Sequence, residues 1–279
     1  MNNMKLHTLL TVAAVFAATA LSAQSVSVLI QDTGIYSISN GDVTLSVDPA
    51  HGGKILSFRL GEREVLSQMR WPNAFGSTFW TSPQAEWNWP PVPEYDSLPY
   101  TAQVTEGPAI VLTGQPSKYG YRIRKTFAAD PADGAIVLTY SILNESGETR
   151  KVAPWEISRV PNGGFLEFDA KPEGVTPADL MKVTFDEGMA TLEVDVADEN
   201  RKINVDGKGW LSFRDNGLIF TKRFPDIAPE DAAPGEAEIQ VYINGRKTFV
   251  EIEAQGPYTV LEPGGKLDWT VRWYLAPEE

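Results

Sequence analysis

Short segments in which apolar and polar residues alternate make up most of this chain after residue 25, and glycine, proline, asparagine or aspartate ends nearly every one. The clearest is residues 250–255, which read Val-Glu-Ile-Glu-Ala-Gln. Because a strand points successive side chains to opposite faces, this spacing predicts one apolar and one polar face. More than a dozen such segments, with almost no helical pattern, predict an all-β domain, either a sandwich or a barrel.

The polar face of residues 250–255 carries Glu251, Glu253 and Gln255 in register. Three polar side chains in register are typical of a binding face. They are equally typical of a strand face that is simply in contact with water. The alternation alone leaves both interpretations open.

Residues 1–23 have the pattern of a secretory signal peptide. Lys5 gives the start a positive charge, residues 9–21 form a short apolar run, and Leu21-Ser22-Ala23 is a small-residue cleavage site. The apolar run is too short for a membrane span. The sequence therefore predicts one exported domain, residues 24–279, that is periplasmic or secreted and does not insert into a membrane.

The residue composition excludes several classes of function. The chain has no cysteine, which excludes disulfides, thiolate metal sites, a cysteine nucleophile and a lipid-modified cysteine. Of the two histidines, His7 lies in the signal peptide, and His51 alone cannot form a multi-histidine zinc site. The net charge of −13 argues against nucleic acid as a partner and would not repel a neutral sugar. No cofactor motif is present; the many carboxylates are compatible with calcium, but no segment points to a calcium site.

Residues 70–100 contain half of the eight tryptophans, together with six prolines. A loop this long is usually either disordered or functional, and such aromatic density argues against disorder. Indole rings bind sugars by stacking on their apolar faces, so Trp80, Trp87 and Trp89 are candidates for sugar contacts. The alternative is that the tryptophans form a small core beneath the loop.

Charged residues interrupt several otherwise apolar segments. Arg124 shares a strand face with Arg122, Glu156 lies three residues before Arg159, and Lys222 follows an apolar run. They are candidates for binding sugar hydroxyls or a carboxylate. Surface charges and structural ion pairs give the same pattern.

Three segments together resemble the galactose mutarotase-like (aldose 1-epimerase-like) superfamily. Residues 51–66, His-Gly-Gly-Lys-Ile-Leu-Ser-Phe-Arg-Leu-Gly-Glu-Arg-Glu-Val-Leu, resemble its N-terminal signature, and residues 76–91 resemble the aromatic loop of a secreted branch. Residues 252–257, Ile-Glu-Ala-Gln-Gly-Pro, are similar to the segment that carries the family's general base, and Glu253 falls on that glutamate. The resemblance implies a β-supersandwich with a sugar site on the concave face of its larger sheet.

The chain departs from this family where the family has its catalytic histidines. Residues 154–159 stand at the family's histidine strand and read Pro-Trp-Glu-Ile-Ser-Arg. Glu156 could replace the acid if burial raised its pKa. A Glu156–Glu253 pair would then place two carboxylates on either side of a sugar.

We therefore expect an exported carbohydrate-binding protein. The expected contacts are stacking by Trp80, Trp87 and Trp89, polar contacts from Arg124, Arg159 and Lys222, and Glu253 with Gln255 at the anomeric carbon. One alternative is a sugar-processing enzyme, an epimerase or a related one, with Glu253 as base and Glu156 as acid. The other is a non-catalytic structural module of a cell-envelope assembly.

Overall fold

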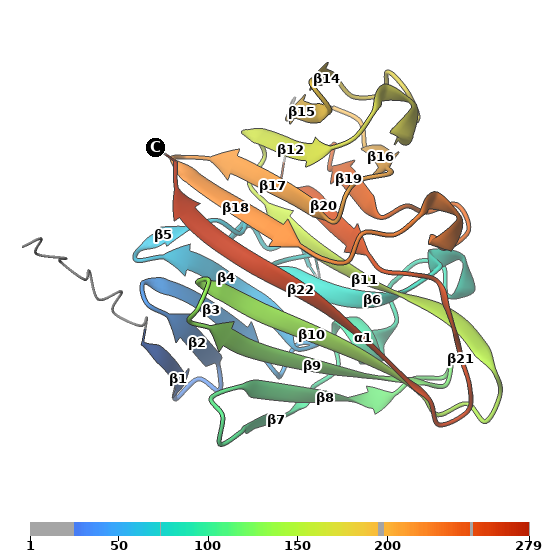
Figure 1. Ribbon diagram of the computed structural model, residues 1–279. Coiled ribbons are helices and arrows are strands. Elements are labelled where there is room, and N and C mark those ends of the chain that lie inside the picture. Colours follow the sequence, from blue (N-terminus) through green and yellow to red (C-terminus); the bar gives the residue numbers. More distant parts are fainter. Residues whose placement is uncertain (1–24, 73, 195–197, 246–247, 279) are drawn as a thin grey trace, which may run out of the picture.

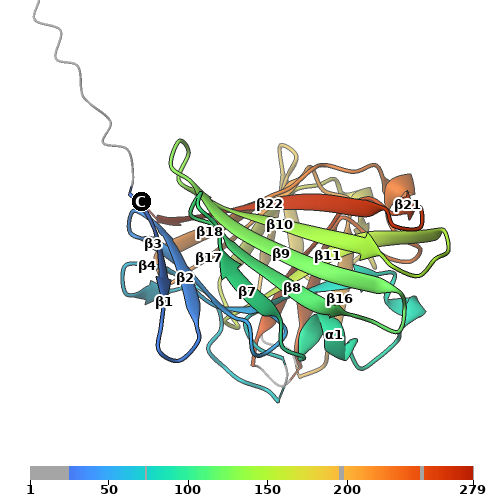
Figure 2. The same ribbon diagram turned by 90° about the horizontal axis from the view of Figure 1, so that it is seen from below.

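The structure, a computed structural model, describes residues 25–72, 74–194, 198–245 and 248–278. These residues form two large antiparallel β-sheets that pack face to face in one domain (Figures 1 and 2). The predicted all-β sandwich is confirmed. The predicted signal peptide lies outside the described residues, and no helix within them is long and apolar enough to cross a membrane.

The first sheet has twelve strands, ten of which follow one another in the order β1-β2-β3-β4-β6-β11-β20-β19-β16-β13, while β5 pairs with β4 and β21 with β11. Their bounds are β1 Val26–Ile30, β2 Tyr36–Asn40, β3 Val43–Asp48, β4 Lys54–Leu60, β5 Arg63–Glu64, β6 Ser77–Ser82, β11 Arg150–Val160, β13 Val175–Thr176, β16 Arg201–Val205, β19 Ile239–Ile243, β20 Val250–Gln255 and β21 Thr259–Leu261.

The second sheet has ten strands in the order β14-β15-β12-β17-β18-β22-β10-β9-β8-β7. Their bounds are β7 Thr101–Val104, β8 Ile110–Pro116, β9 Tyr121–Asp130, β10 Ala135–Asn144, β12 Phe165–Asp169, β14 Val183–Asp186, β15 Met189–Glu193, β17 Trp210–Asp215, β18 Leu218–Arg223 and β22 Lys266–Pro277. The described helices are short: α1 Pro93–Asp96 and the 3₁₀ turns η1 Gln84–Glu86, η2 Pro172–Gly174 and η3 Pro229–Asp231.

The alternation in residues 250–255 becomes the two faces of β20. Val250, Ile252 and Ala254 are fully buried and belong to the core. The glutamates and Gln255 occupy the opposite face, which we call the outer face of the first sheet. β20 lies between β11 and β19, so both neighbouring strands contribute side chains to that face.

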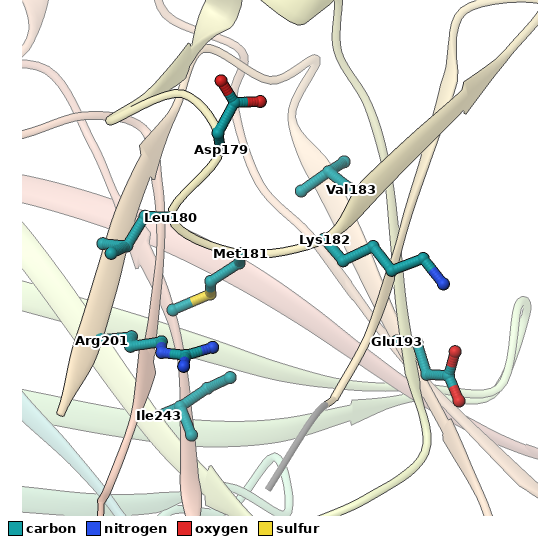
Figure 3. Close-up of a pocket in the computed structure, with 8 residues that line it drawn as sticks. All are labelled: Asp179, Leu180, Met181, Lys182, Val183, Glu193, Arg201 and Ile243. Atoms are coloured by element: carbon teal, nitrogen blue, oxygen red, sulfur yellow. The ribbon is translucent and has the colours of Figure 1, made fainter. Parts of the chain in front are cut away.

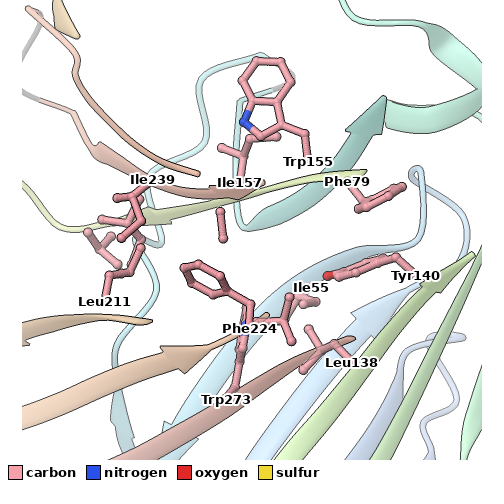
Figure 4. Packing of buried hydrophobic residues seen from close by; sticks show 14 of the residues in the cluster. Ile55, Phe79, Leu138, Tyr140, Trp155, Ile157, Leu211, Phe224, Ile239 and Trp273 are labelled. Atoms are coloured by element: carbon pink, nitrogen blue, oxygen red, sulfur yellow. The ribbon is translucent and has the colours of Figure 1, made fainter. Parts of the chain in front are cut away.

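Aromatic rings fill much of the space between the sheets. Phe79 of β6 stacks on Tyr140 of β10 with 4.3 Å between ring centroids (Figure 4). Phe58 of β4 contacts Phe220 and Trp273 of the second sheet, with 5.2 Å between ring centroids in each pair. Burying one such ring contributes roughly 1.5–3 kcal/mol to folding. This core joins the sheets and holds β6 and β11 in place.

Candidate functional site

Strand pairing decides which side chains share the outer face of the first sheet. Trp155 of β11 lies opposite Trp80 of β6 on one side and Gln255 of β20 on the other. Two residues further along each strand, Ile157 lies opposite Glu253. Figure 4 shows Trp155 on the other side of its strand from the inter-sheet rings. The outer face therefore combines indole rings with carboxylates.

Residues 70–100, which we call the aromatic loop, fold over this face, and Asp96 of α1 anchors them. The buried Asp96 carboxylate accepts hydrogen bonds from Thr78 Oγ1 (3.1 Å) and Trp80 Nε1 (3.0 Å), and its other oxygen pairs with Lys54 Nζ at 2.9 Å. A charged lysine and two neutral donors thus satisfy one buried carboxylate. The network fixes the orientation of the Trp80 indole.

The glycine pair of the His-Gly-Gly-Lys signature explains how α1 comes so near the first sheet. Gly52 has φ +70°, and a Cβ at that position would lie 2.0 Å from the carbonyl oxygen of Asp96. Only glycine combines this conformation with such a close approach. The signature therefore brings Lys54 and Asp96 together at the base of the loop.

A pocket of about 330 Å³ opens between the loop and the outer face, within the size range of small-molecule sites. Trp71, Trp80 and Trp89 line it with four prolines, and Asp96 and Arg159 are its charged residues. Trp89 is 67% exposed and Trp71 is 44% exposed. Two indoles therefore present open surface for stacking beside fixed polar groups.

Arg159 of β11 forms one wall of this pocket and is only 2% exposed. Its guanidinium pairs with Glu251 at 2.8 Å and donates to the carbonyl oxygen of Phe75 at 3.3 Å. Nε is buried without a hydrogen-bond partner among the described residues. Pairing with Glu251 supplies the counter-charge that a buried guanidinium requires.

Glu253 lies on the same outer face, beneath Lys202 of β16. Its carboxylate accepts hydrogen bonds from Trp155 Nε1 (2.8 Å) and from Lys202 Nζ (3.0 Å). Burial raises the pKa of Glu253, and the nearby Lys202 charge opposes that rise. The Lys202 ammonium also lies 4.9 Å from the centroid of the Trp155 ring. Two donors therefore hold the Glu253 carboxylate, and the residue is only 1% exposed.

The structure does not bring Glu156 and Glu253 together. Glu156 points between the sheets, where its carboxylate pairs with Lys222 at 2.7 Å, and both side chains are fully buried. Ser77 and Ser158 donate hydrogen bonds of 2.7 and 2.8 Å to the same carboxylate. The expectation that the two glutamates enclose one sugar is therefore wrong. Glu253 lies opposite Ile157, and Glu156, the residue before Ile157, points to the other side of the sheet because consecutive strand residues face opposite sides.

Three further expected contacts lie away from the pocket. Lys222 is part of the core pair just described, and Arg124 is exposed on the outer side of the second sheet. Trp87 is buried, donates to the carbonyl oxygen of Thr81 at 2.9 Å and packs edge-on against Trp80. Lys222 and Trp87 support the structure around the site, and Arg124 is remote from it.

Gln255 is buried at the end of β20 and joins two loops. Its Nε2 donates to Glu236 at 2.6 Å, and Glu236 also accepts the N–H of Gln84 at 2.6 Å and a hydrogen bond from Ser82. These contacts connect the aromatic loop to residues 232–237. Gln255 therefore positions the loop and does not line the pocket.

Sequence reasoning missed four residues of this region. The sequence patterns do not indicate a role in the site for Asp96, Trp71, Lys54 or Lys202. The first two nevertheless lie within the aromatic segment, residues 70–100. A carboxylate among tryptophans and prolines was a usable signal for Asp96. Lys202 had none, because only strand pairing across β19 and β20 brings it to Glu253.

A second pocket, of about 420 Å³, lies near β14 and β16 (Figure 3). Figure 3 shows Met181, Arg201 and Ile243 gathered on one side, with the charged ends of Lys182 and Glu193 on another. None of the described residues that line it is aromatic. Within the described ranges, no three His, Cys, Asp or Glu side chains are grouped so as to hold a metal ion.

No protein-family model and no curated protein matches the sequence. The fold has counterparts among solved structures. A galactose mutarotase-like protein from Lactobacillus casei superposes with a TM-score of 0.60 at 11% identity, covering 87% of this chain and all of that one. A candidate aldose 1-epimerase from Escherichia coli K12 gives 0.59 at 12% identity, covering 87% of this chain and 99% of that one.

The same fold also forms part of a larger chain. A TPR-domain containing protein from Parabacteroides distasonis superposes with a TM-score of 0.56 at 16% identity, covering 88% of this chain and 47% of that one. Identities this low establish the architecture alone. This chain has the galactose mutarotase-like fold, which confirms the fold that the sequence resemblance implied.

Proposed function

We propose that this protein is an exported carbohydrate-binding protein whose ligand occupies the pocket beneath the aromatic loop. The supporting observation is the set of indoles at Trp71, Trp80 and Trp89 beside the anchored charges of Asp96 and Arg159. Apolar sugar faces stack on such rings, and fixed polar groups orient the hydroxyls. Export is proposed from the signal-peptide pattern of residues 1–23.

Tryptophan fluorescence of the mature protein, titrated with neutral and uronic mono- and oligosaccharides, tests the proposal. We expect a saturable change in the emission of the wild type and at least tenfold weaker binding by Trp89→Ala. Phe165→Ala is the control, because Phe165 is an exposed ring on β12 of the second sheet. If no sugar changes the signal, or if both variants bind like the wild type, the proposal is wrong.

The enzyme alternative is separated from binding by a second measurement. Of the two glutamates expected to act on a sugar, Glu253 alone lies on the outer face, where Lys202 pairs with it. If the protein only binds sugar, it will not accelerate anomer exchange of a bound sugar, followed by NMR. Acceleration that disappears in Glu253→Gln would instead identify an epimerase. The structural-module alternative predicts neither binding nor turnover, but a protein partner in pull-down experiments.

A further inference from the structure

A wide pocket of about 940 Å³ lies where β13 and β16 meet the loop between β18 and β19. It shares no lining residue with the pocket under the aromatic loop. Its walls include two lysines and five carboxylates, at Asp169, Glu173, Glu187, Asp206 and Glu236. This excess of negative charge favours a ligand with a positive group.

Glu238, the residue before β19, lines a small recess of about 60 Å³ next to the wide pocket. The recess and the wide pocket share Asp206 and Glu236. The Glu238 side chain is 2% exposed, and its Oε1 accepts the N–H of Gly209 at 2.6 Å. Oε2 is buried and has no hydrogen-bond partner among the described residues. A buried carboxylate oxygen without a donor is costly, and a ligand with a donor would remove that cost.

The charges that act on Glu238 do not neutralise it. Asp206 and Asp226 carry the same sign, and Lys208 is the opposing cation, with its Nζ 3.8 Å from Asp226. Burial is the main reason that the pKa of Glu238 is raised to about 7, and the two aspartates add to the rise. A cation bound at Oε2 would stabilise the ionised carboxylate.

The residues around the recess suit an ammonium group better than a metal ion. Calcium takes six to eight oxygen ligands, whereas no group of three acidic or histidine side chains is placed to bind a metal in the described parts of the chain. An ammonium group has three N–H donors and needs only a few acceptors. Ile227, Ala228 and Pro229 give the recess apolar walls that can contact a carbon skeleton.

We propose that the wide pocket binds a carbohydrate unit carrying a primary ammonium group, which donates a hydrogen bond to Oε2 of Glu238. The carbohydrate nature of the ligand rests on the proposed function. The two sites have separate residues, so variants in one pocket test it independently of the other. The expected ligand is an amino sugar or an oligosaccharide that contains one.

Isothermal titration calorimetry of the mature protein at pH 8 with 6-amino-6-deoxyglucose tests the proposal, because an alkyl amine stays protonated at that pH. We expect at least tenfold weaker binding of its N-acetylated form. Glu238→Gln should weaken binding of the amine at least tenfold, since it removes the charge and keeps the side-chain size. Glu62→Gln, the control, removes an exposed carboxylate outside the pocket, in the turn between β4 and β5, and should change affinity less than threefold.

The pH dependence of the wild type gives a second test that needs no variant. Because the pKa of Glu238 is about 7, affinity for the amine should fall roughly tenfold from pH 8 to pH 6 as the carboxylate is protonated. Equal affinity for the amine and its N-acetylated form, or an unchanged Glu238→Gln, would overturn the inference. So would calcium binding that depends on Glu238 without any amine binding. If Trp89→Ala abolishes binding of the amine and Glu238→Gln does not, the inference fails while the proposed function stands.

Discussion

Replacing Glu156 with glutamine tests whether this carboxylate is a structural element of the core. The substitution keeps the side-chain volume and removes the counter-charge of Lys222, which lies 2.7 Å away and is fully buried. Breaking one partner of a buried ion pair costs about 3–5 kcal/mol. Ser77 and Ser158 also lose a charged acceptor, so we expect Glu156→Gln to lower the free energy of unfolding by about 3–5 kcal/mol.

The ionisation of Lys222 sets an upper limit on this loss of stability. With its counter-charge gone, Lys222 can release its proton; from an ordinary pKa of 10.5, this costs about 5 kcal/mol at pH 7. Burial already lowers the pKa of Lys222 in the wild type, and Glu156 opposes that effect. In the variant, the unfolded state therefore binds more protons than the folded state, so its stability rises with pH. The deficit of Glu156→Gln should shrink between pH 7 and pH 9.

Urea unfolding followed by tryptophan fluorescence measures these differences, and the double variant Glu156→Gln/Lys222→Met is the matched control. Removing both charges should recover most of the lost stability, because replacing a buried pair by apolar residues is often close to neutral. Folded Glu156→Gln should bind sugar like the wild type. A loss below about 1 kcal/mol would refute the structural interpretation. A tenfold loss of sugar affinity at unchanged stability would restore Glu156 as a site residue.

Three further predictions separate the site from its supports. Trp87→Ala should lower the free energy of unfolding, measured in urea, by about 3–5 kcal/mol, because the Trp87 ring is buried. Trp89→Ala should instead weaken sugar binding with little change in stability, because the Trp89 ring is exposed. Burial lowers the pKa of Lys125 to about 7 in the folded protein. Above pH 7 the unfolded state therefore binds more protons than the folded state, and the stability of the wild type rises with pH. The wild type should gain roughly 1 kcal/mol per pH unit over Lys125→Met between pH 7 and pH 9, and parallel urea midpoints would contradict this. Burial raises the pKa of Glu253 above its ordinary value of 4.5, so above pH 4.5 the folded state binds more protons than the unfolded state. The wild type should therefore lose stability relative to Glu253→Gln as the pH rises above 4.5. Urea unfolding at a series of pH values measures this difference.

The strands β20 and β11 show why some of the site could be predicted and some could not. β20 alternates because its core face is apolar and its outer face carries carboxylates, so the sequence separates the two. In β11, every residue from Val152 to Val160 is buried, since the second sheet covers one face and the aromatic loop the other. A strand covered on both faces has no polar side in its sequence. The direction of Glu156 could therefore not be read from its neighbours.

The aromatic segment gives a similar division at the level of single rings. Its density of tryptophan and proline predicted either a sugar-stacking surface or a small core, and the structure contains both exposed and buried rings. Trp89 is open to solvent, whereas Trp87 is buried between Trp80 and Trp155. Adjacent positions in an irregular loop follow no fixed period, so spacing cannot say which ring points outward.

The sequence by itself determined the all-β class, the apolar face of β20 and the resemblance to the galactose mutarotase-like fold. It also supplies the glycine pair that lets Asp96 approach the first sheet. These depend on local rules: alternation along a strand and the positive φ of a turn. The tertiary structure alone decided that Lys202 pairs with Glu253, that Glu156 pairs with Lys222, and that one Glu238 oxygen has no hydrogen-bond partner among the described residues. These are contacts between residues far apart in the sequence, and only strand order and sheet packing bring them within hydrogen-bond distance.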